Sequence, residues 1–302
     1  MHPSHVELIV AIADAGSLGA AARRIGKTQP ALTKALKRAE EDVGVQLFYR
    51  GAHGAHMTAD GARVVERCRR ILRDLDALAE DLAQRRGELT GQIGVVVSPL
   101  AAMKIIPPVM ARFGSRFRGV RVQIRGGHAP KAFAALHSAE ADFVIGPGPS
   151  SGGEPGLIAE PLLRTGLALL TGANSRYART TDPKILGEAP WAAIGPRGRR
   201  PYYADFLEAN GIAAKEPVLL SDSILSILSV LESSDLVCSF PSLVLPEILS
   251  RWNVVQVPVE MGPTGVDIAL THARGRILTP AAMAFGDLVH EESRRLRDHN
   301  PG

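Results

Sequence analysis

The sequence predicts an α/β fold in three parts: a small, mostly helical N-terminal domain, one long helix, and a larger C-terminal domain of two α/β lobes. Three observations support this prediction. Residues 1–59 combine helical periodicity with glycine-containing turns, residues 60–88 carry a long helical pattern, and residues 89–302 alternate strand-like and helical segments. We therefore expect domain boundaries near residues 59 and 88.

The composition is that of an ordinary globular protein. The 302 residues are 45% hydrophobic and 22% charged with a net charge of +4, which excludes a disordered chain and is compatible with nucleic-acid binding. Cys68 and Cys238 fall in different predicted domains, so we expect no disulfide framework and a cytoplasmic location. No segment reaches the roughly 18 apolar residues of a membrane span, and no signal-peptide pattern is found, so we expect no membrane partner.

The N-terminal domain is predicted to contain three helices. Gly16 ends the first helix, Ser17 caps a second over residues 18–24, and a third follows over residues 28–42 after Gly26. Two short helices joined by a tight glycine-containing turn are typical of a helix-turn-helix.

The third predicted helix is amphipathic, and its polar face carries chemistry suited to DNA. Glutamine can form paired hydrogen bonds with adenine, threonine can contact bases, and lysine can reach guanine or phosphate. A polar helix face is usually only solvated, but its place in a helix-turn-helix favours the DNA interpretation. The residues of this face are Gln29, Pro30, Thr33, Lys34 and Lys37.

The run from Gly16 to Arg50, continued by MTADG at residues 57–61, resembles the N-terminal domain of LysR-type transcriptional regulators. The resemblance implies a winged helix-turn-helix that binds double-stranded promoter DNA. It also implies that Arg50 holds the DNA backbone beside the wing. It implies DNA contacts at Thr28, Gln29, Pro30, Thr33 and Lys34, to which Lys37 adds a phosphate contact. The positions that match the family pattern are Ser17, Ala21, Ala22, Gln29, Pro30, Ala31, Gly44, Leu47, Phe48, Arg50, Thr58 and Gly61.

The wing departs from the pattern of that family. His53 and His56 stand where members often carry arginine or lysine, so we expect a weaker attraction of the wing to DNA. The two histidines could suggest a metal site, but the sequence offers no third ligand cluster with a recognised spacing. We therefore expect no metal and no cofactor.

Residues 60–86 are predicted to form one long helix with a coiled-coil seam. Apolar or small residues recur at alternating spacings of three and four, as in heptad positions a and d. Such a seam could pack on its own domain, but about 25 helical residues extend about 37 Å and outrun a small domain, which favours pairing with a second copy. After Gly61, the seam residues are Val64, Cys68, Ile71, Leu75, Leu78 and Leu82.

Beyond the linker near residues 87–91, the pattern is that of βαβ units. Strands are predicted at residues 92–97, 120–124, 142–146, 167–171, 191–195, 217–221, 235–240, 253–259 and 266–272. Helices are predicted near residues 100–113, 128–139, 201–210, 223–233, 242–250 and 280–297. The expected lobes are lobe I, about residues 89–164 and 266–302, and lobe II, about residues 165–265. The family resemblance implies a periplasmic-binding-protein-like (type 2) domain that binds a small inducer, often a carboxylate or an aromatic acid.

Ligands of open α/β sheets bind beyond the carboxyl ends of the strands, so the cleft between the lobes is the predicted effector site. The segment GPRGRRPYY presents arginines before a helix, and among them Arg197 is the preferred partner for a carboxylate or sulfonate. Each candidate serine could instead be an ordinary helix cap, and each arginine a surface charge. The predicted effector-binding residues are Ser98, Gly127, His128, Arg197, Ser221, Asp222 and Ser223.

The main rival classes are an enzyme and a solute-binding protein built on the two-lobed domain. The sequence contains no GxSxG, GxxxxGK[ST], HExxH or CxxC motif. A solute-binding protein has no use for residues 1–60. We therefore predict no enzyme, but a regulator that acts as a homodimer or tetramer, contacts promoter DNA and responds to a small acidic inducer, with RNA polymerase as a further candidate partner.

Overall fold

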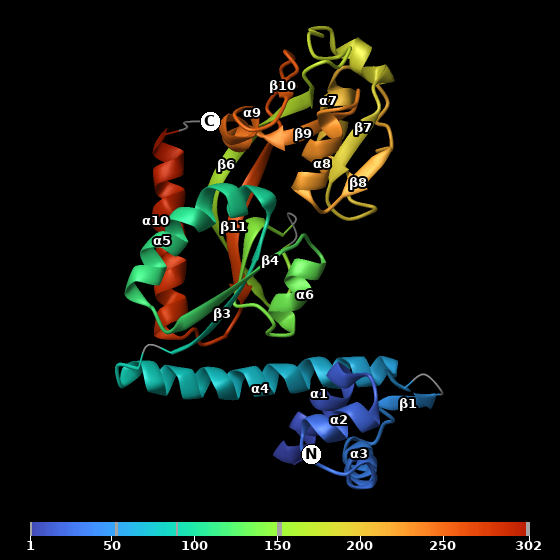
Figure 1. The fold of residues 1–302 in the computed structure, drawn as a ribbon, viewed down its shortest axis with the longest axis vertical. Coiled ribbons are helices and arrows are strands. Elements are labelled where there is room, and N and C mark those ends of the chain that lie inside the picture. The colour runs from blue at the N-terminus through green and yellow to red at the C-terminus, as the bar shows by residue number, and fades with distance from the viewer. Residues whose placement is uncertain (1, 52–53, 89, 150–152, 300–302) are drawn as a thin grey trace.

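The computed structural model describes residues 2–51, 54–88, 90–149 and 153–299, and it contains the three predicted parts (Figure 1). The N-terminal domain consists of α1 (Pro3–Ala15), α2 (Leu18–Arg24), α3 (Gln29–Val43) and a hairpin of β1 (Phe48–Gly51) and β2 (Gly54–Met57). The predicted winged helix-turn-helix is confirmed.

The helix boundaries follow the capping residues that the sequence indicates. The Ser17 hydroxyl accepts a hydrogen bond from the Ala20 amide at 3.2 Å, and the Thr28 hydroxyl accepts one from the Ala31 amide at 3.4 Å. Gly16 ends α1 in the left-handed region with φ 63°. These residues satisfy amide groups that would otherwise lack a partner at the helix ends.

The wing is fixed to the turn between α1 and α2. The Ala55 amide donates to the Gly16 carbonyl at 2.8 Å. Gly54 has φ 120°, and a Cβ atom there would lie 2.4 Å from the same carbonyl oxygen. The hairpin can approach the helix-turn-helix only because residue 54 has no side chain.

The long helix α4 (Ala59–Arg85) begins against the wing. The Thr58 hydroxyl accepts from the Gly61 amide at 2.8 Å and donates to the Gln46 carbonyl at 2.8 Å. A Cβ atom on Gly61 would lie 2.0 Å from the Leu47 carbonyl oxygen. The MTADG segment therefore has a physical role, since it caps α4 and lets its first turn pack directly on the chain before the wing.

Lobe I is a sheet with α5 and α10 on one face and α6 on the other (Figure 1). Strands β4, β3 and β5 are parallel neighbours, and β11 pairs with β5 in the antiparallel sense. The elements are β3 (Gly91–Val97), the π-helical turn η1 (Ala101–Ile105), α5 (Ile106–Arg116), β4 (Val120–Gly126), α6 (Lys131–His137), β5 (Phe143–Pro147), β11 (Gly265–Ala273) and α10 (Pro280–His299).

Lobe II is built around the parallel strands β8, β7 and β9, and β9 pairs with β6 in the antiparallel sense. Its elements are the 3-10 turn η2 (Pro183–Glu188), β7 (Trp191–Ile194), α7 (Tyr203–Ala209), β8 (Leu219–Ser221), α8 (Ile224–Leu231), β9 (Val237–Pro241), the 3-10 turn η3 (Ser242–Val244), α9 (Leu245–Leu249) and β10 (Val254–Gln256). The two-lobed α/β architecture is confirmed.

The strand β6 (Leu157–Gly172) is much longer than the sequence predicts. It pairs with β11 in lobe I and with β9 and β10 in lobe II, so it runs through both lobes. Only its last six residues, 167–172, are continuously buried, whereas the residues before them are a mixture of buried, half-buried and exposed positions. The sequence signal of the first half is therefore weak.

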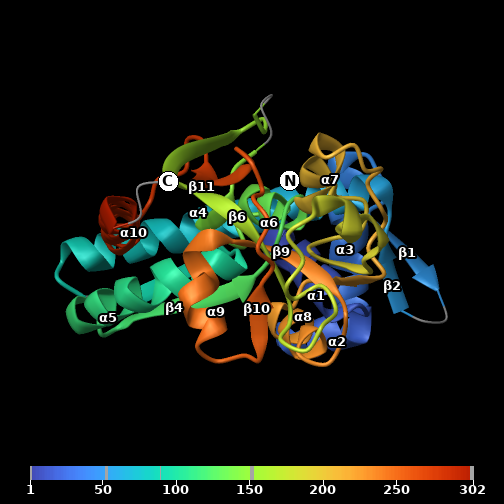
Figure 2. The same ribbon diagram turned by 90° about the horizontal axis from the view of Figure 1, so that it is seen from above.

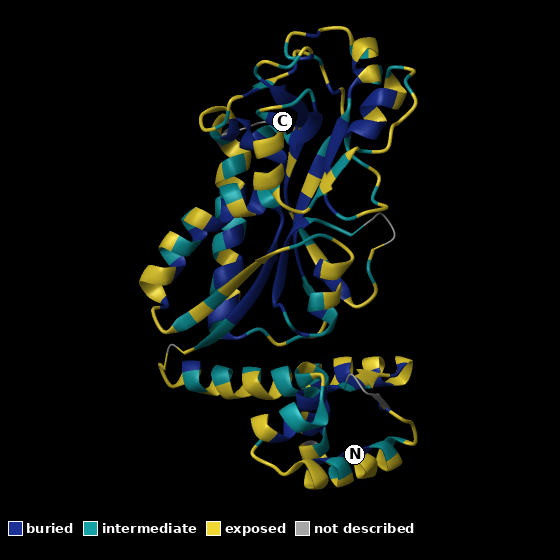
Figure 3. Ribbon diagram, turned by 45° about the vertical axis from the view of Figure 1, so that its right-hand side comes forward, coloured by how far each residue is buried: buried dark blue, intermediate teal, exposed yellow. Residues whose placement is uncertain are grey.

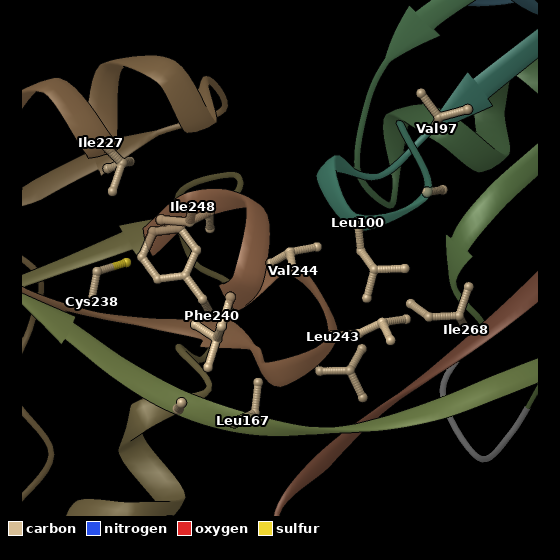
Figure 4. Packing of buried hydrophobic residues seen from close by; sticks show 14 of the residues in the cluster. Val97, Leu100, Leu167, Ile227, Cys238, Phe240, Leu243, Val244, Ile248 and Ile268 are labelled. Atoms are coloured by element: carbon tan, nitrogen blue, oxygen red, sulfur yellow. The ribbon is translucent and has the colours of Figure 1, made fainter. Parts of the chain in front are cut away.

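The two lobes share one hydrophobic core (Figure 4). Val97, Leu100 and Ile268 of lobe I belong to the same buried cluster as Phe240 and Val244 of lobe II. Wide opening of the lobes would expose part of this apolar surface, at roughly 25 cal/mol for each Å².

Helix α4 lies between the helix-turn-helix and lobe I (Figure 1), and the view from above shows the wing strands β1 and β2 on the opposite side of the molecule from α5 and α10 (Figure 2). On the lobe I side, the Gln84 side chain accepts from the Ala281 amide at 2.9 Å and donates to the Thr90 carbonyl at 2.8 Å. None of the helices in the described ranges is long and apolar enough to span a membrane.

Candidate functional sites

The predicted DNA-reading residues lie on the outer face of α3. Thr28, Gln29, Pro30, Lys34 and Lys37 are exposed, and Thr33 is half-buried. Leu32, Leu36 and Ala39 of the same helix are fully buried against α1 and α2. The helix therefore presents one continuous polar face away from the domain core, which is the geometry that major-groove reading requires.

The glutamine on this face lies over the preceding helix. A Cβ atom on Gly19 of α2 would lie 3.3 Å from the Gln29 side-chain oxygen, so that side chain packs on the bare backbone of α2. Lys37 forms an exposed ion pair with Glu41 at 3.7 Å. This pair is worth little in water, so Lys37 remains available to a phosphate group.

The wing residues are described only in part. Arg50 lies on β1 opposite Ala55, but the position of its side chain lies outside the description, as does the whole of His53. His56 is exposed on β2. The chain from α3 to the wing is held by Glu40, whose carboxylate accepts from the amides of Leu47 and Phe48 at 2.8 and 3.2 Å. This anchor was not evident from the sequence.

The predicted seam of α4 divides into two parts. Cys68 is fully buried and Val64 is half-buried in the core of the helix-turn-helix domain of the same chain. The sequence-based prediction had placed both residues in a seam that faces a second copy. Ile71, Leu75, Leu78 and Leu82 are exposed, by 43% to 56%. Figure 3 shows exposed positions recurring along α4. The first turns of α4 thus pack into the core of the N-terminal domain, whereas the later turns present an exposed apolar stripe.

A cleft lies between the two lobes and is lined mainly by apolar side chains. Ser98 and His128 line it as expected from the sequence. Gly127 lines an adjoining pocket that shares His128 and Arg199. The principal lining residues are Ser98, Leu100, His128, Pro147, Val266 and Ile268 from lobe I, and Ile194, Arg199, Tyr202, Leu220, Ile224 and Phe240 from lobe II.

Two arginines line the cleft, Arg199 and Arg200. Arg200 is exposed and paired with Asp205 and Glu208, so Arg199 is the cation left for a ligand, and the preference for Arg197 is not what the structure shows. Arg197 is exposed and does not line the cleft, whereas Arg199 is half-buried and lines it. Gly195 and Gly198 have φ of 130° and 83°, and this tight turn after β7 determines which arginine points inward. Sequence reasoning missed Arg199 because neighbouring arginines in a glycine-rich turn are indistinguishable without the backbone path.

Tyr202 holds Arg199 in place. The Arg199 guanidinium hydrogen-bonds to the Tyr202 hydroxyl, and its central carbon lies 4.9 Å from the centre of the tyrosine ring. Within the described part of the chain, Arg199 has no carboxylate partner in an ion pair. The contact with a neutral ring leaves the positive charge of Arg199 uncompensated.

His128 faces the same charge across the cleft. Burial lowers the pKa of His128, the positive charge of Arg199 lowers it further, and the carboxylate of Asp222 opposes both effects. The imidazole is therefore neutral near pH 7 and can act as a hydrogen-bond donor or acceptor. Asp222 belongs to the electrostatic surroundings of the cleft, although it is not among the residues that line it.

The predicted serines act mainly as caps. Ser98 is buried and accepts from the Ala101 amide at 3.3 Å. Ser221 accepts from the Ser223 amide at 3.1 Å, and Ser223 caps α8 by accepting from the Ser226 amide at 3.3 Å. Ser98 combines a capping role with a place on the cleft wall, whereas Ser221 and Ser223 lie beside the lining residues Leu220 and Ile224.

The described residues contain no cluster of three or more histidine, cysteine or acidic side chains arranged to hold a metal ion. Cys68 and Cys238 are both buried as free thiols, in the N-terminal domain and lobe II respectively.

Comparison with known proteins identifies both domains. Residues 3–62 match the bacterial regulatory helix-turn-helix protein, lysR family, and residues 86–294 match the LysR substrate binding domain. The HTH-type transcriptional regulator GalR of Pseudomonas putida is 26% identical over 284 residues, which cover 93% of this chain and 71% of the relative. The HTH-type transcriptional regulator TdcA of Escherichia coli is 22% identical over 292 residues, which cover 96% and 92%.

Solved structures show the same fold. CbnR, a LysR family transcriptional regulator, superposes with a TM-score of 0.69 at 19% identity, covering 97% of this chain and 99% of that chain. Full-length CbnR in complex with its target DNA superposes with a TM-score of 0.68 at 19% identity, covering 97% of this chain and 100% of that chain. This chain belongs to the LysR family of DNA-binding transcriptional regulators and carries the substrate-binding domain of that family.

Proposed function

We propose that this chain binds promoter DNA sequence-specifically as a dimer or tetramer, and that a small carboxylic acid bound between the lobes controls this binding. The observation that carries the proposal is the uncompensated guanidinium of Arg199 in a cleft with mainly apolar walls. A charged hydrogen bond to an anion is strongest where water is excluded, so a carboxylate is the group that this cation selects.

The rest of the cleft suits the hydrocarbon part of such a ligand. Ile194, Leu220 and Ile224 of lobe II face the cleft with Phe240, and Ile268 approaches from lobe I. These side chains offer contact area without fixed polar groups, which favours an aromatic or branched aliphatic body. The neutral imidazole of His128 adds one hydrogen-bonding group near Arg199.

A thermal-shift screen with matched acids and amides tests the proposed ligand class. Aromatic and aliphatic carboxylates such as benzoate are compared with their neutral amides, for example benzamide. A ligand that binds only the folded state stabilises that state by about 2.7 kcal/mol when its concentration is 100 times its Kd, and the melting temperature rises as a result. We expect stabilisation by at least one acid and none by its amide. Equal shifts for acid and amide, or no shift with any acid, would contradict the role given to Arg199.

Replacing Gln29 by alanine is expected to reduce sequence preference. A paired hydrogen bond to a base contributes about 1–3 kcal/mol of discrimination, so the ratio of affinities for selected and random duplexes should fall by about 5- to 150-fold. The selected duplex is obtained by enrichment from a random pool with the unaltered protein. Lys37→Ala is the matched control, because a lost phosphate contact should weaken both duplexes equally. Equal losses for Gln29→Ala would overturn its assignment to a base.

Introducing a charge into the exposed stripe of α4 is expected to dissociate the oligomer. Leu78→Glu places a carboxylate at a seam position that a second helix would cover, and burial of an unpaired charge costs several kcal/mol. Sedimentation velocity should show a shift from dimer or tetramer to monomer. Arg70→Glu, at an exposed site outside the stripe, is the control and should leave the oligomeric state unchanged. An oligomer that survives Leu78→Glu would assign the interface elsewhere.

A further inference from the structure

The helix α6 connects the cleft to α4 through lobe I. At one end, the segment 127–130 precedes α6, and its residue His128 lines the cleft while its carbonyl accepts from the Ala132 amide at 3.0 Å. At the other end, the chain turns at residues 138–142 and enters β5. Figure 1 shows α6 on the side of lobe I that faces α4.

The turn after α6 contacts α4, and through Arg69 of α4 it is connected to the helix-turn-helix domain. The Arg73 side chain donates to the carbonyl of Ala139 at 2.7 Å. Arg69 lies 3.7 Å from the carboxylate of Glu140 and 2.6 Å from that of Asp14, near the end of α1. One arginine of α4 therefore bridges lobe I and the DNA-binding domain.

The two ends of this turn are held differently. Asp142, at its end, is fixed inside lobe I by Arg276 at 2.7 Å and by the Gly94 amide at 2.7 Å. Ala139 and Glu140, at its start, are held by Arg73 and Arg69 of α4, with Arg125 of β4 donating to the Glu140 carbonyl at 2.7 Å. A displacement of α6 would therefore move Ala139 and Glu140 relative to Arg73 and Arg69, while Asp142 stays fixed and Arg125 limits the movement of Glu140.

Helix α6 can move without disturbing the main core. Ala132, Phe133 and Leu136 pack in a small separate cluster with Val96, Val144 and their neighbours, on the opposite face of the sheet from α5 and α10. The main core, in contrast, joins the two lobes and resists their separation. The apolar contacts of α6 are therefore those of a small cluster, and its C-terminal end is also held by the ion pair of His137 with Glu154 at 3.6 Å. A ligand beside His128 meets the segment that leads into this helix, and the helix leads to α4.

We propose that α6 and the turn at residues 138–142 form a mechanical relay, which converts occupancy of the cleft beside His128 into a change in the contacts of Arg69 and Arg73 with lobe I. The relay rests on the proposed function, since it gives the route by which the ligand acts. A shift of α6 disturbs only the small cluster beneath this helix, whereas wide opening of the lobes would separate their shared core.

Hydrogen exchange measured by mass spectrometry on the full-length protein tests the relay from the cleft end, without a ligand. In Gly127→Ala, the new Cβ atom would lie 2.7 Å from a methyl group of Val96, so this methyl group and the segment that leads into α6 must move apart. Gly126→Ala is the matched control, because a Cβ atom there meets nothing within 4 Å. We expect about tenfold faster exchange at residues 69–73 and 139–141 in Gly127→Ala only. A change confined to residues 126–133 would overturn the relay.

A second variant tests the relay from the α4 end. Removing both arginines in R69A/R73A should accelerate exchange at residues 127–137 by about tenfold, whereas Arg70→Ala, exposed on the same helix, should not. Unchanged exchange in β3 and β11 confirms that lobe I remains folded in each variant. No change at residues 127–137 in R69A/R73A would overturn the relay. Because neither experiment uses a ligand, a failed acid screen and a failed relay are distinguishable.

Discussion

Replacing Arg199 by alanine is expected to abolish most of the affinity for the acid that the screen identifies. Removal of one partner of a desolvated, hydrogen-bonded charge pair costs about 2–5 kcal/mol, which corresponds to a loss of at least about 30-fold in Kd. Arg199 lines the cleft, and Tyr202 holds its guanidinium through the ring face and the hydroxyl. Isothermal titration of the variant with the same acid measures the loss.

The chain offers a matched control two residues away. Arg197→Ala removes the same charge from the same glycine-rich turn, but Arg197 is exposed and does not line the cleft. We expect its Kd for the acid to change by less than about threefold, because an exposed charge is screened by solvent and salt. Equal losses in both variants would indicate general electrostatic attraction by the turn, and no loss in Arg199→Ala would assign the anion to another group.

The winged helix-turn-helix was predictable because its signals are local. Gly16, Ser17 and Thr28 act within four residues of themselves, as a left-handed helix end or as caps. From the sequence, Gly61 belongs to the family pattern and to the start of the seam, whereas the structural reason for this glycine is the Leu47 carbonyl, fourteen positions earlier. Local chemistry therefore predicts the helices, whereas the packing that requires this glycine depends on the fold.

The coiled-coil seam of α4 shows where periodicity is ambiguous. The spacing from Val64 to Leu82 is continuous, yet Cys68 is buried in its own domain while Leu75 is half exposed. An apolar stripe on a helix does not reveal whether it packs on its own chain or on a second copy, because both kinds of packing require apolar side chains at the same spacing. The first turns of α4 pack on the N-terminal domain, and the later turns remain exposed because the helix is longer than that domain.

The location of the cleft between the lobes could be predicted from the sequence, but the arginine that would bind an anion there could not. Ser98 and His128 follow the carboxyl ends of predicted strands, and both line the cleft as this position predicts. The choice between Arg197 and Arg199 depended on the positive φ of Gly195 and Gly198, and the shared core of the two lobes depended on contacts between distant segments. Backbone conformation in glycine-rich turns and long-range packing are the properties that single-sequence periodicity does not encode.

Replacing Asp142 by alanine is expected to be the most destabilising change outside the hydrophobic core. Its side chain is 10% exposed and that of its partner Arg276 is 8% exposed, at 2.7 Å from each other. Breaking a buried ion pair on one side leaves an uncompensated charge and costs about 3–5 kcal/mol. Urea unfolding followed by circular dichroism should show a corresponding fall in the free energy of unfolding.

An exposed pair in the same domain provides the comparison. Arg164 and Asp267 join β6 to β11 at 3.0 Å, but their side chains are 61% and 72% exposed, so Asp267→Ala should cost less than about 1 kcal/mol. A similar small cost for Asp142→Ala would mean that water reaches Arg276. The larger cost would explain why Asp142 can serve as the fixed end of the turn after α6. A relay needs one rigid anchor, and a carboxylate held by both Arg276 and the Gly94 amide inside the lobe is the group in this turn that can provide it.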